Sequence, residues 1–446
     1  MELIKIQELK DKGRFDAAPF VSCDSSLVRF TKRIPSQKIG NISYIHKVRN
    51  RDSRIYVNDE SRGLMYLSNT DMQKSSYDSV QYMSKKFLSN LESQKLKKGD
   101  IIVSAVGTIG QVALINELLE NAVISGNILR FTPKMEGGYI YAYLQSKYGQ
   151  ANLINIASGS VQDFITPPKL SEFEIPILSE SIQKITHKLI LDASNLRLQA
   201  NAMIMKAQNY FDNLNINYKY GAKTSQLISI KQLSRGYKRF DASYAIVCEK
   251  VEKSIIENQV QYTTISAQSS NIFIGPRAKR NYVKNGVPFL TTSAMQKFDP
   301  TKTDRYLSSK NSQGFIVSEG WILTTRSGTL GDTVFTLPCM DSFAVTEDAI
   351  RIVINQNSEL SNYYIYAFLK SSIGKSSLLS GSYGSVIQHL NEDYVGDIKV
   401  PIFSHGIIEE INISVKKHVD FLNEAILKEK SAIKLIENEI ESWQKF

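Results

Sequence analysis

Residue types that carry out catalysis occur in this 446-residue sequence, but they do not fall at catalytic spacing. The one Pro-Pro pair, Pro167-Pro168, follows Thr166, so no Asn-Pro-Pro-aromatic or Asp-Pro-Pro-aromatic tetrad is present. Gly374-Lys375-Ser376 is similar to the end of a phosphate-binding loop, but Leu369 stands where that loop needs a glycine. The 3 cysteines and 5 histidines are too scattered for a disulfide framework or a metal site. We therefore expect a chain that is not an enzyme and holds no metal or cofactor.

Two short glycine-rich stretches are better candidates for contact with a ligand. Gly107-Thr108-Ile109-Gly110 and Gly328-Thr329-Leu330-Gly331 each contain glycines that permit a tight turn or close approach of a ligand backbone. Arg326 stands beside the second stretch, and a cation next to exposed backbone donors suits a phosphate or a guanine edge. We predict nucleic-acid contacts from Thr108, Thr329 and Arg326. The alternative is that both stretches are hairpin turns and nothing more.

A second pair of loops carries small hydroxyl side chains. Ser158-Gly159-Ser160-Val161-Gln162 has its counterpart in Tyr383-Gly384-Ser385-Val386, and Gln388 follows shortly after. A glutamine can contact adenine in a bidentate manner, so Ser160, Gln162 and Ser385 join the predicted contacts. A lone glutamine is also an ordinary surface residue.

Positive charge is concentrated in two clusters. The chain has 54 Lys and Arg against 44 Asp and Glu, for a net charge of +10, which favours a polyanionic partner. The first cluster holds His46, Lys47, Arg49, Arg51 and Arg54, and the second holds Arg277, Lys279, Arg280 and Lys284. Runs of charge are often only solvated surface, but two at comparable places favour nucleic acid. No apolar signal region or membrane-length apolar run occurs, so we expect a cytoplasmic protein without membrane contact.

The sequence is duplicated in tandem. Short motifs recur in the same order at offsets of 221 to 225 residues, as expected after one duplication followed by loop insertions. The matches are Arg14-Phe15-Asp16-Ala17 with Arg239-Phe240-Asp241-Ala242, Tyr66-Leu67-Ser68 with Phe289-Leu290-Thr291, Gly99-Asp100-Ile101-Ile102 with Gly320-Trp321-Ile322-Leu323, Tyr139-Ile140-Tyr141 with Tyr364-Ile365-Tyr366, Gly159-Ser160-Val161 with Gly384-Ser385-Val386, and Ile175-Pro176-Ile177 with Val400-Pro401-Ile402. Strands are predicted around each glycine turn, a helix at each tyrosine-rich motif, and a linker over 221–229.

A long amphipathic helix is predicted at the end of each half. Over 182–214, apolar residues recur at spacings of three and four, with one extra four that we interpret as a local slip in the heptad. Adding 226 to those positions gives apolar residues again, except at Glu429. We expect the two helices to pair, although each could instead pack on its own domain. The predicted interface residues are Ile185, Leu189, Leu196, Met203, Ile411, Val415, Leu422 and Ile433.

These repeats resemble the specificity subunit of type I restriction–modification systems, over nearly the whole chain. The resemblance rests on the Gly-Asp-Ile-Ile…Gly-Thr-Ile-Gly turn, the Gly-Ser-Val loop, the Ile-Pro-Ile lead into each helix, and their duplicated order. It implies an α+β fold with two tandem-duplicated target-recognition domains separated by two long antiparallel coiled-coil helices. The domains would be 1–178 and 221–403, and the spacer helices 179–220 and 404–446. Glu429 and the Gly-Trp-Ile-Leu form of the second turn depart from the pattern.

The resemblance also implies a function. The chain would read a bipartite, asymmetric target in double-stranded DNA, one half-site per domain. It would bind two methyltransferase subunits, which use S-adenosylmethionine, and restriction/translocase subunits would join for cleavage. Three alternatives remain: a specificity subunit of another methylation-based phage-defence system, an autonomous DNA-modifying enzyme, and a protein scaffold whose basic patches are incidental.

Overall fold

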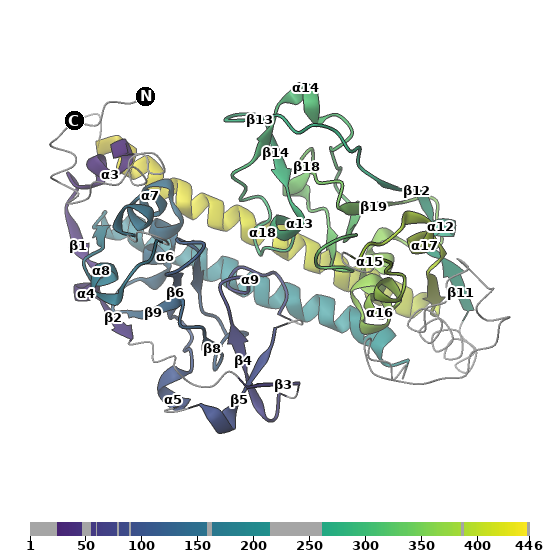
Figure 1. Ribbon diagram of the computed structural model, residues 1–446, viewed down its shortest axis with the longest axis horizontal. Helices are drawn as coiled ribbons and strands as arrows, with labels where there is room; N and C mark the ends of the chain where they lie inside the picture. The colour runs from purple at the N-terminus through teal and green to yellow at the C-terminus, as the bar shows by residue number, and fades with distance from the viewer. Residues whose placement is uncertain are drawn as a thin grey trace. The chain divides into compact units, whose positions relative to one another are not determined.

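The computed structural model describes residues 25–46, 55–58, 60–77, 80–88, 91–157, 163–214, 261–384 and 388–443 (Figure 1). The chain divides into two compact units. Unit 1 comprises Met1–Leu198 and Ala425–Phe446, and unit 2 comprises Gln199–Glu424. The predicted linker over 221–229 and the two Arg-Phe-Asp-Ala motifs lie outside the described residues.

Unit 1 contains two four-stranded sheets and one strand pair. The sheet orders are β2-β9-β6-β7 and β3-β5-β4-β8, and β1 pairs with β10. The strands are β1 (Ser36–Lys38), β2 (Ser43–His46), β3 (Tyr56–Val57), β4 (Gly63–Leu67), β5 (Tyr82–Ser84), β6 (Ile101–Ser104), β7 (Val112–Leu114), β8 (Val123–Ile124), β9 (Ile128–Pro133) and β10 (Glu174–Pro176). The shorter helices are α3 (Ser25–Thr31), α4 (Ile39–Ile42), η1 (Lys85–Phe87), α5 (Leu91–Gln94), α6 (Gly137–Gln145), α7 (Lys147–Ile156) and α8 (Pro167–Ser171).

Unit 2 repeats this topology strand for strand. Its sheet orders are β12-β19-β16-β17 and β13-β15-β14-β18, and β11 pairs with β20. The strands are β11 (Gln261–Thr264), β12 (Ser269–Ile274), β13 (Tyr282–Val283), β14 (Val287–Leu290), β15 (Tyr306–Leu307), β16 (Ile322–Thr325), β17 (Thr333–Phe335), β18 (Ala344–Val345), β19 (Ala349–Ile354) and β20 (Lys399–Ile402). The shorter helices are α12 (Ile265–Gln268), α13 (Thr292–Met295), α14 (Ser309–Ser312), η2 (Pro338–Met340), α15 (Asn362–Lys370), α16 (Ser372–Ser380) and α17 (Glu392–Asp397). The predicted duplication and the α+β class are therefore confirmed.

The predicted core elements form as the apolar pattern requires. The β6–β7 and β16–β17 hairpins surround the two glycine turns, and both central strands are buried along their whole length. The tyrosine-rich motifs form α6 and α15, whose aromatic residues are almost entirely buried. In α6, for example, Tyr139 is buried and donates its hydroxyl to the carbonyl of Pro176 at 2.6 Å. These aromatics therefore belong to the core and do not form a ligand platform.

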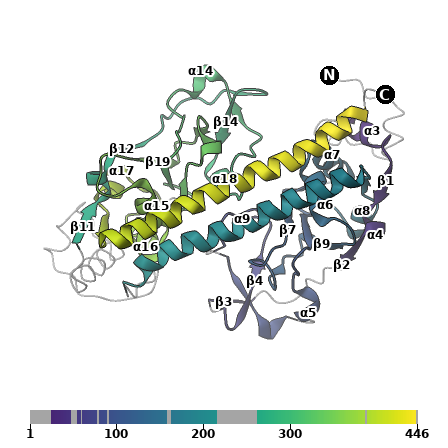
Figure 2. The ribbon, with the colours of Figure 1, turned by 180° about the vertical axis from the view of Figure 1, so that it is seen from behind.

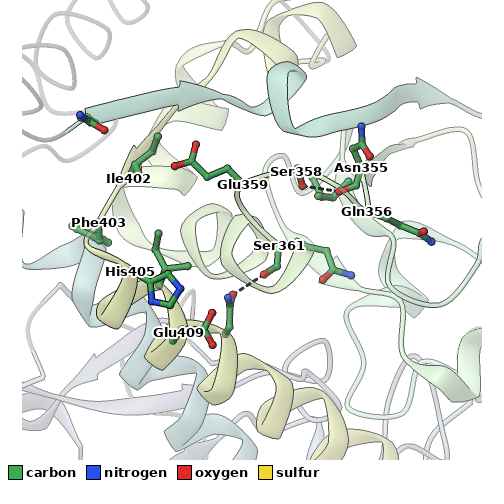
Figure 3. A pocket seen from close by; sticks show the side chains of 14 residues that line it. Asn355, Gln356, Ser358, Glu359, Ser361, Ile402, Phe403, His405 and Glu409 are labelled. Carbon is green, nitrogen blue, oxygen red and sulfur yellow. Dashed lines mark hydrogen bonds between the residues drawn. The ribbon is translucent and has the colours of Figure 1, made fainter.

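A longer loop in unit 2 explains why the offset between repeats changes. Residues 355–361 connect β19 to α15, whereas only residues 134–136 connect β9 to α6. The four additional residues raise the offset from 221 to 225. Residues of the 355–361 loop also line a cavity of about 500 Å³, in which Ser361 donates to Asn412 of the following long helix at 2.6 Å (Figure 3). No residue of the glycine turns or of the basic clusters lines this cavity.

The two longest helices, α9 (Glu180–Asp212) and α18 (His405–Ser442), each contribute one segment to each unit. Within each unit the two segments lie side by side (Figure 2). In unit 2, His418 contacts the carbonyl of Ala200, and Tyr210 donates to Glu410, so numbers rise on one helix as they fall on the other. The predicted antiparallel helix pair is confirmed.

On α9, each predicted interface residue lies one position before a residue of the buried stripe. Ile185 is 48% exposed, and Leu189, Leu196 and Met203 are only half-buried. The buried stripe consists of Thr186, Ile190, Ala193, Arg197, Ala200, Ile204, Ala207 and Phe211, of which Arg197 alone is half-buried. These positions alternate by four and three without interruption, so the predicted slip is wrong and the heptad is regular. The prediction failed because polar Thr186 and Arg197 belong to the buried stripe, and a search for apolar residues avoids them.

The buried stripe of α18 has the same spacing at an offset of 225, not 226. Ile411 and Val415 are buried as predicted, whereas Leu422 and Ile433 are half-buried. Its members are Ile411, Val415, His418, Leu422, Ala425, Glu429, Ala432 and Ile436. An offset of 225 is also that of the motifs preceding each helix. Glu429 therefore corresponds to Ile204, and Arg197 corresponds to Leu422.

Candidate nucleic-acid interface

The two glycine turns are built by the same hydrogen bonds. In unit 1, Ser104 Oγ donates to the carbonyl of Thr108 at 2.5 Å and accepts from the Gln111 backbone at 2.9 Å. In unit 2, Thr325 Oγ1 donates to the carbonyl of Thr329 and accepts from the Asp332 backbone at 3.1 Å. The bounding glycines have φ between 76° and 87°, which L side chains adopt only with strain. The backbone of each turn is thus held by a hydroxyl side chain at the end of the preceding strand.

This construction presents one threonine at the tip of each turn. Thr108 and Thr329, the two predicted contacts, are both exposed. Thr329 Oγ1 also accepts a hydrogen bond from Gln296 Nε2 at 2.6 Å. A hydroxyl on a rigid turn can both donate and accept, which suits either a phosphate or a base edge.

The flanks of the Gly-Ser-Val loops lie beside the glycine turns. In unit 1, Phe164 forms a β-bridge with Val106, and the backbone of Ile165 donates to the carbonyl of Ala105 at 2.8 Å. In unit 2, Ser327 forms a bridge with His389, and the backbone of Leu390 donates to the carbonyl of Arg326 at 2.9 Å. The predicted contacts Ser160, Gln162 and Ser385 lie outside the described residues, so only the flanks of their loops are described beside the glycine turns.

A third loop in each unit joins the same region, and sequence reasoning missed it. Asn69, which follows β4, donates to the carbonyl of Val106 at 2.6 Å. Gln296, which follows α13, reaches Thr329 in unit 2. The only sequence signal was indirect: both amides follow the repeated Tyr66 and Phe289 strand motifs. Each unit therefore gathers segments from three separate parts of the chain around its exposed threonine.

The second basic cluster contains three exposed cations, one of which, Lys284, follows β13. Arg277 and Lys279 are exposed on the segment that precedes β13. Arg280 is different, because its Nη2 lies 2.5 Å from Glu347 Oε2 and its guanidinium covers the ring of Phe289. Its charge is already compensated within the fold, so it is a weaker candidate for a phosphate contact than its two neighbours.

Only the first residue of the first basic cluster is described. Lys47, Arg49, Arg51 and Arg54 lie outside the described residues. His46 Nε2 lies 2.8 Å from Thr132 Oγ1, and Thr132 in turn donates to Asp100. Burial, aided by the charge of Arg130, lowers the pKa of His46, so its ring is neutral at pH 7 and adds no positive charge.

The side chain of Arg326 does not lie on the surface. It is 6% exposed, and its backbone N–H donates to the carbonyl of Asp348 at 2.9 Å. The prediction assumed that a residue beside the glycine turn would face solvent, but Arg326 continues the buried strand β16, as Ala105 continues β6 in unit 1. The expected direct contact from Arg326 therefore requires a rearrangement and is not supported by this burial.

Within the described parts of the chain, no group of three or more His, Cys, Asp or Glu side chains could hold a metal ion. No helix in those parts has the length and apolar character needed to cross a membrane. The groups described around the exposed threonines are hydroxyls and amides that can form hydrogen bonds. Unit 2 also has exposed cations at Arg277, Lys279 and Lys284. This is the set of groups that contacts phosphates and base edges in protein–DNA complexes.

The fold and these loops define a protein built from two copies of one recognition-type unit. Residues 33–202 match the model of the type I restriction modification DNA specificity domain. Most of unit 1 is thus similar to that DNA specificity domain, which confirms the resemblance seen in the sequence. No curated protein matches the sequence significantly.

Solved structures with similar chains come from the same systems. One is the type I restriction-modification S subunit from M. genitalium, which is 15% identical, with 91% of this chain and 94% of that chain covered and a TM-score of 0.34. Another is the HsdS subunit from Thermoanaerobacter tengcongensis, with 13% identity, coverages of 91% and 95%, and a TM-score of 0.29. A third, from a study of type I system assembly, has 12% identity, coverages of 92% and 97%, and a TM-score of 0.30.

Proposed function

We propose that this chain is the DNA-specificity subunit of a type I restriction–modification complex. The observation that carries the proposal is the family match over residues 33–202, together with the repetition of the same sheet orders in unit 2. One such unit reads one short sequence, so two units in one chain read a bipartite target. The chain itself does not transfer methyl groups; two methyltransferase subunits with S-adenosylmethionine, and restriction/translocase subunits, supply the chemistry.

The target is asymmetric because the two units differ where they would contact DNA. Ala105 in unit 1 corresponds to Arg326 in unit 2, and Phe164 corresponds to His389. Thr329 is held by a glutamine, whereas Asn69 of unit 1 binds a backbone carbonyl near the turn. Units that share a backbone but differ in the side chains around one turn present different hydrogen-bonding patterns to base pairs.

The helix pair sets the distance between the half-sites in this proposal. Two long helices that pair along a regular heptad are stiff, and each has a segment packed into each unit. The same helices offer exposed faces to the methyltransferase subunits. The recognised bases then depend on the loops, and the number of base pairs between half-sites depends on the helices.

The test is selection of bound sequences from random double-stranded DNA by the full chain with its methyltransferase partner. The expected result is one motif of two unequal half-sites separated by a fixed number of unspecified base pairs. Selection of a single uninterrupted motif, or of none, overturns the proposal. Methyl transfer by the purified chain alone would instead show an autonomous enzyme.

A further inference from the structure

A charged pair is buried between the two long helices in unit 1. Arg197 Nη2 of α9 lies 2.6 Å from Glu429 Oε2 of α18, and the side chain of Glu429 is 4% exposed. Glu429 Oε1 also accepts from the hydroxyl of Tyr141 on α6 at 2.9 Å, and that hydroxyl accepts from Gln145 Nε2 at 3.2 Å. Burial and the charge of Glu429 raise the pKa of Tyr141 well above its usual value, so the phenol stays a donor.

Many of the other residues of the buried stripe repeat the same kind of side chain at intervals of seven. On α9, Ala193, Ala200 and Ala207 follow one another at intervals of seven, and Ala425 and Ala432 do so on α18. The other column contains Ile190, Arg197, Ile204 and Phe211 on α9, and Val415, Leu422, Glu429 and Ile436 on α18. A shift by seven residues therefore places aliphatic on aliphatic over most of the second column, where Arg197 and Glu429 are the charged exceptions. In the first column it places alanine on alanine only in part, because that column also contains Thr186 on α9 and Ile411 and His418 on α18. His418 lies 2.8 Å from the carbonyl oxygen of Ala200 in the native register.

In the shifted registers Arg197 and Glu429 are no longer opposite each other. The native pairing joins 197 with 429, whereas a one-heptad shift places Glu429 opposite Ile190 or Ile204 and Arg197 opposite Leu422 or Ile436. Each shifted register buries a carboxylate and a guanidinium without a partner, which is strongly unfavourable. A single buried polar position that fixes register is known from coiled coils in general.

Unit 2 has no charged pair at the corresponding positions. Leu422 corresponds to Arg197 and Ile204 to Glu429, so the pseudo-symmetric copy of the pair is aliphatic. Tyr366, which corresponds to Tyr141, stacks on His418 instead, with ring centroids 6.0 Å apart. The charged pair is therefore not a requirement of the fold, since the same fold forms around apolar residues in the other repeat.

We propose that the Arg197–Glu429 pair selects the register of the two helices and thereby determines the number of base pairs between the half-sites. The inference rests on the proposed function, because a gap exists only if the target is bipartite. One heptad corresponds to about 10 Å along a helix. At roughly 3.4 Å per base pair, that shift equals about three base pairs. Both residues are positioning residues, and neither contacts DNA.

The test compares gap selection by four forms of the full chain with its methyltransferase partner. They are the wild type, the apolar variant Arg197→Leu/Glu429→Leu, the reversed variant Arg197→Glu/Glu429→Arg, and the control Lys206→Leu/Glu410→Leu. The control removes an ion pair between the same helices that is 3.6 Å long and exposed. The half-site sequences are read in the same selection and should not change in any variant.

We expect one gap length for the wild type, the reversed variant and the control. The apolar variant should bind additional targets whose gap differs by about three base pairs, at one tenth or more of the affinity for the native gap. An apolar variant that folds and retains a single gap overturns the inference. A wild type that selects no bipartite motif overturns the proposed function instead.

A second measurement reports the register without DNA. Lys206 lies against Glu410 in the native register, so a shift of one heptad brings Lys206 against Lys417. Lys206→Cys/Lys417→Cys should therefore form no cross-link on mild oxidation in the wild-type background. It should form one in the Arg197→Leu/Glu429→Leu background, and Lys206→Cys/Glu410→Cys reports the native register in both. This pair reports a shift in one of the two directions, so absence of the shifted cross-link together with a single selected gap in the apolar background contradicts the inference.

Discussion

Arg130 Nε lies 2.7 Å from Asp100 Oδ2 in the interior of unit 1, and both side chains are less than 5% exposed. In unit 2, Trp321 replaces Asp100, and the corresponding Arg351 donates to the carbonyls of Val345, Thr346 and Ala349 instead. Burial lowers the pKa of Arg351 to about 10. The tryptophan in the second copy of the Gly-Asp-Ile-Ile motif thus accompanies a second difference between the units. The buried arginine forms an ion pair with aspartate in unit 1 and contacts backbone carbonyls in unit 2.

Removing the acid of this pair should destabilise the protein strongly. Asp100→Ala leaves Arg130 buried without its carboxylate, so we expect a loss of about 3–5 kcal/mol in the free energy of unfolding. Lys98→Ala is the matched control, because it removes an ion pair with Glu117 in which both side chains are about half exposed. The control should change the free energy by at most about 1 kcal/mol. Denaturant titration measures both, and equal losses would contradict the assignment.

The burial observed along α9 predicts that alanine substitutions at two of its isoleucines affect stability differently. Ile190 is 2% exposed and belongs to the core of unit 1, whereas Ile185 is 48% exposed. Ile190→Ala should lower the free energy of unfolding by about 2–5 kcal/mol. Ile185→Ala should change it by less than about 0.5 kcal/mol. A larger loss for Ile185→Ala in thermal or denaturant unfolding would restore the face predicted from apolar spacing.

The buried His418 should make the protein less stable in acid. Burial lowers its pKa to about 4, with a further contribution from the charge of Lys370, while its hydrogen bond to Ala200 opposes the shift. The unfolded chain, with a pKa near 6.5, binds the proton first. The contribution of His418 is therefore fully present above about pH 6.5 and is lost as the pH falls toward 4.

The measurement is denaturant unfolding at several values between pH 7 and pH 4. His418→Gln should show a smaller loss of stability over this range than the wild type. His405→Gln serves as the control on the same helix, because His405 is exposed. An unchanged pH dependence in the His418 variant would show that another group causes the loss.

The exposed threonines should each affect one half-site. Thr108→Val and Thr329→Val retain the shape of the side chain and remove one hydroxyl, so the fold should keep its stability. Loss of one hydrogen bond to DNA costs about 1 kcal/mol, or roughly fivefold in affinity. Sequence selection should relax in one half-site for the first variant and in the other half-site for the second. Each variant is the control for the other, and relaxation of the same half-site by both would argue against one site per unit.

The exposed cations of unit 2 should contribute to the salt dependence of DNA binding. Arg277→Gln/Lys279→Gln should reduce the slope of log K against log salt by about 2, because each phosphate contact contributes about 1. Arg280→Gln should change the slope less, since Glu347 already pairs with that residue. Affinity measured between low and moderate salt tests this, and an unchanged slope in the double variant would remove these cations from the interface.

The sequence by itself determined the duplication, the hairpins around the glycine turns, the buried tyrosine-rich helices and the existence of two long helices. These features follow from local periodicity and from matches between the halves, which need no knowledge of distant contacts. The sequence also selected Thr108 and Thr329 as candidate contacts, because glycines permit a tight turn or a close approach by a ligand, but their exposure is seen only in the structure.

Only the tertiary structure decided which polar residues are inside. The sequence placed Glu429 at a position of the predicted helix seam, but its partner Arg197, 232 positions away, looks like a surface residue until the helices are placed together. The same holds for Asp100 with Arg130, and for Arg326, whose burial depends on the strands that cover it. A buried charged side chain is stabilised by an opposite charge or by hydrogen-bonding groups around it, and sequence spacing does not show which distant residues supply them.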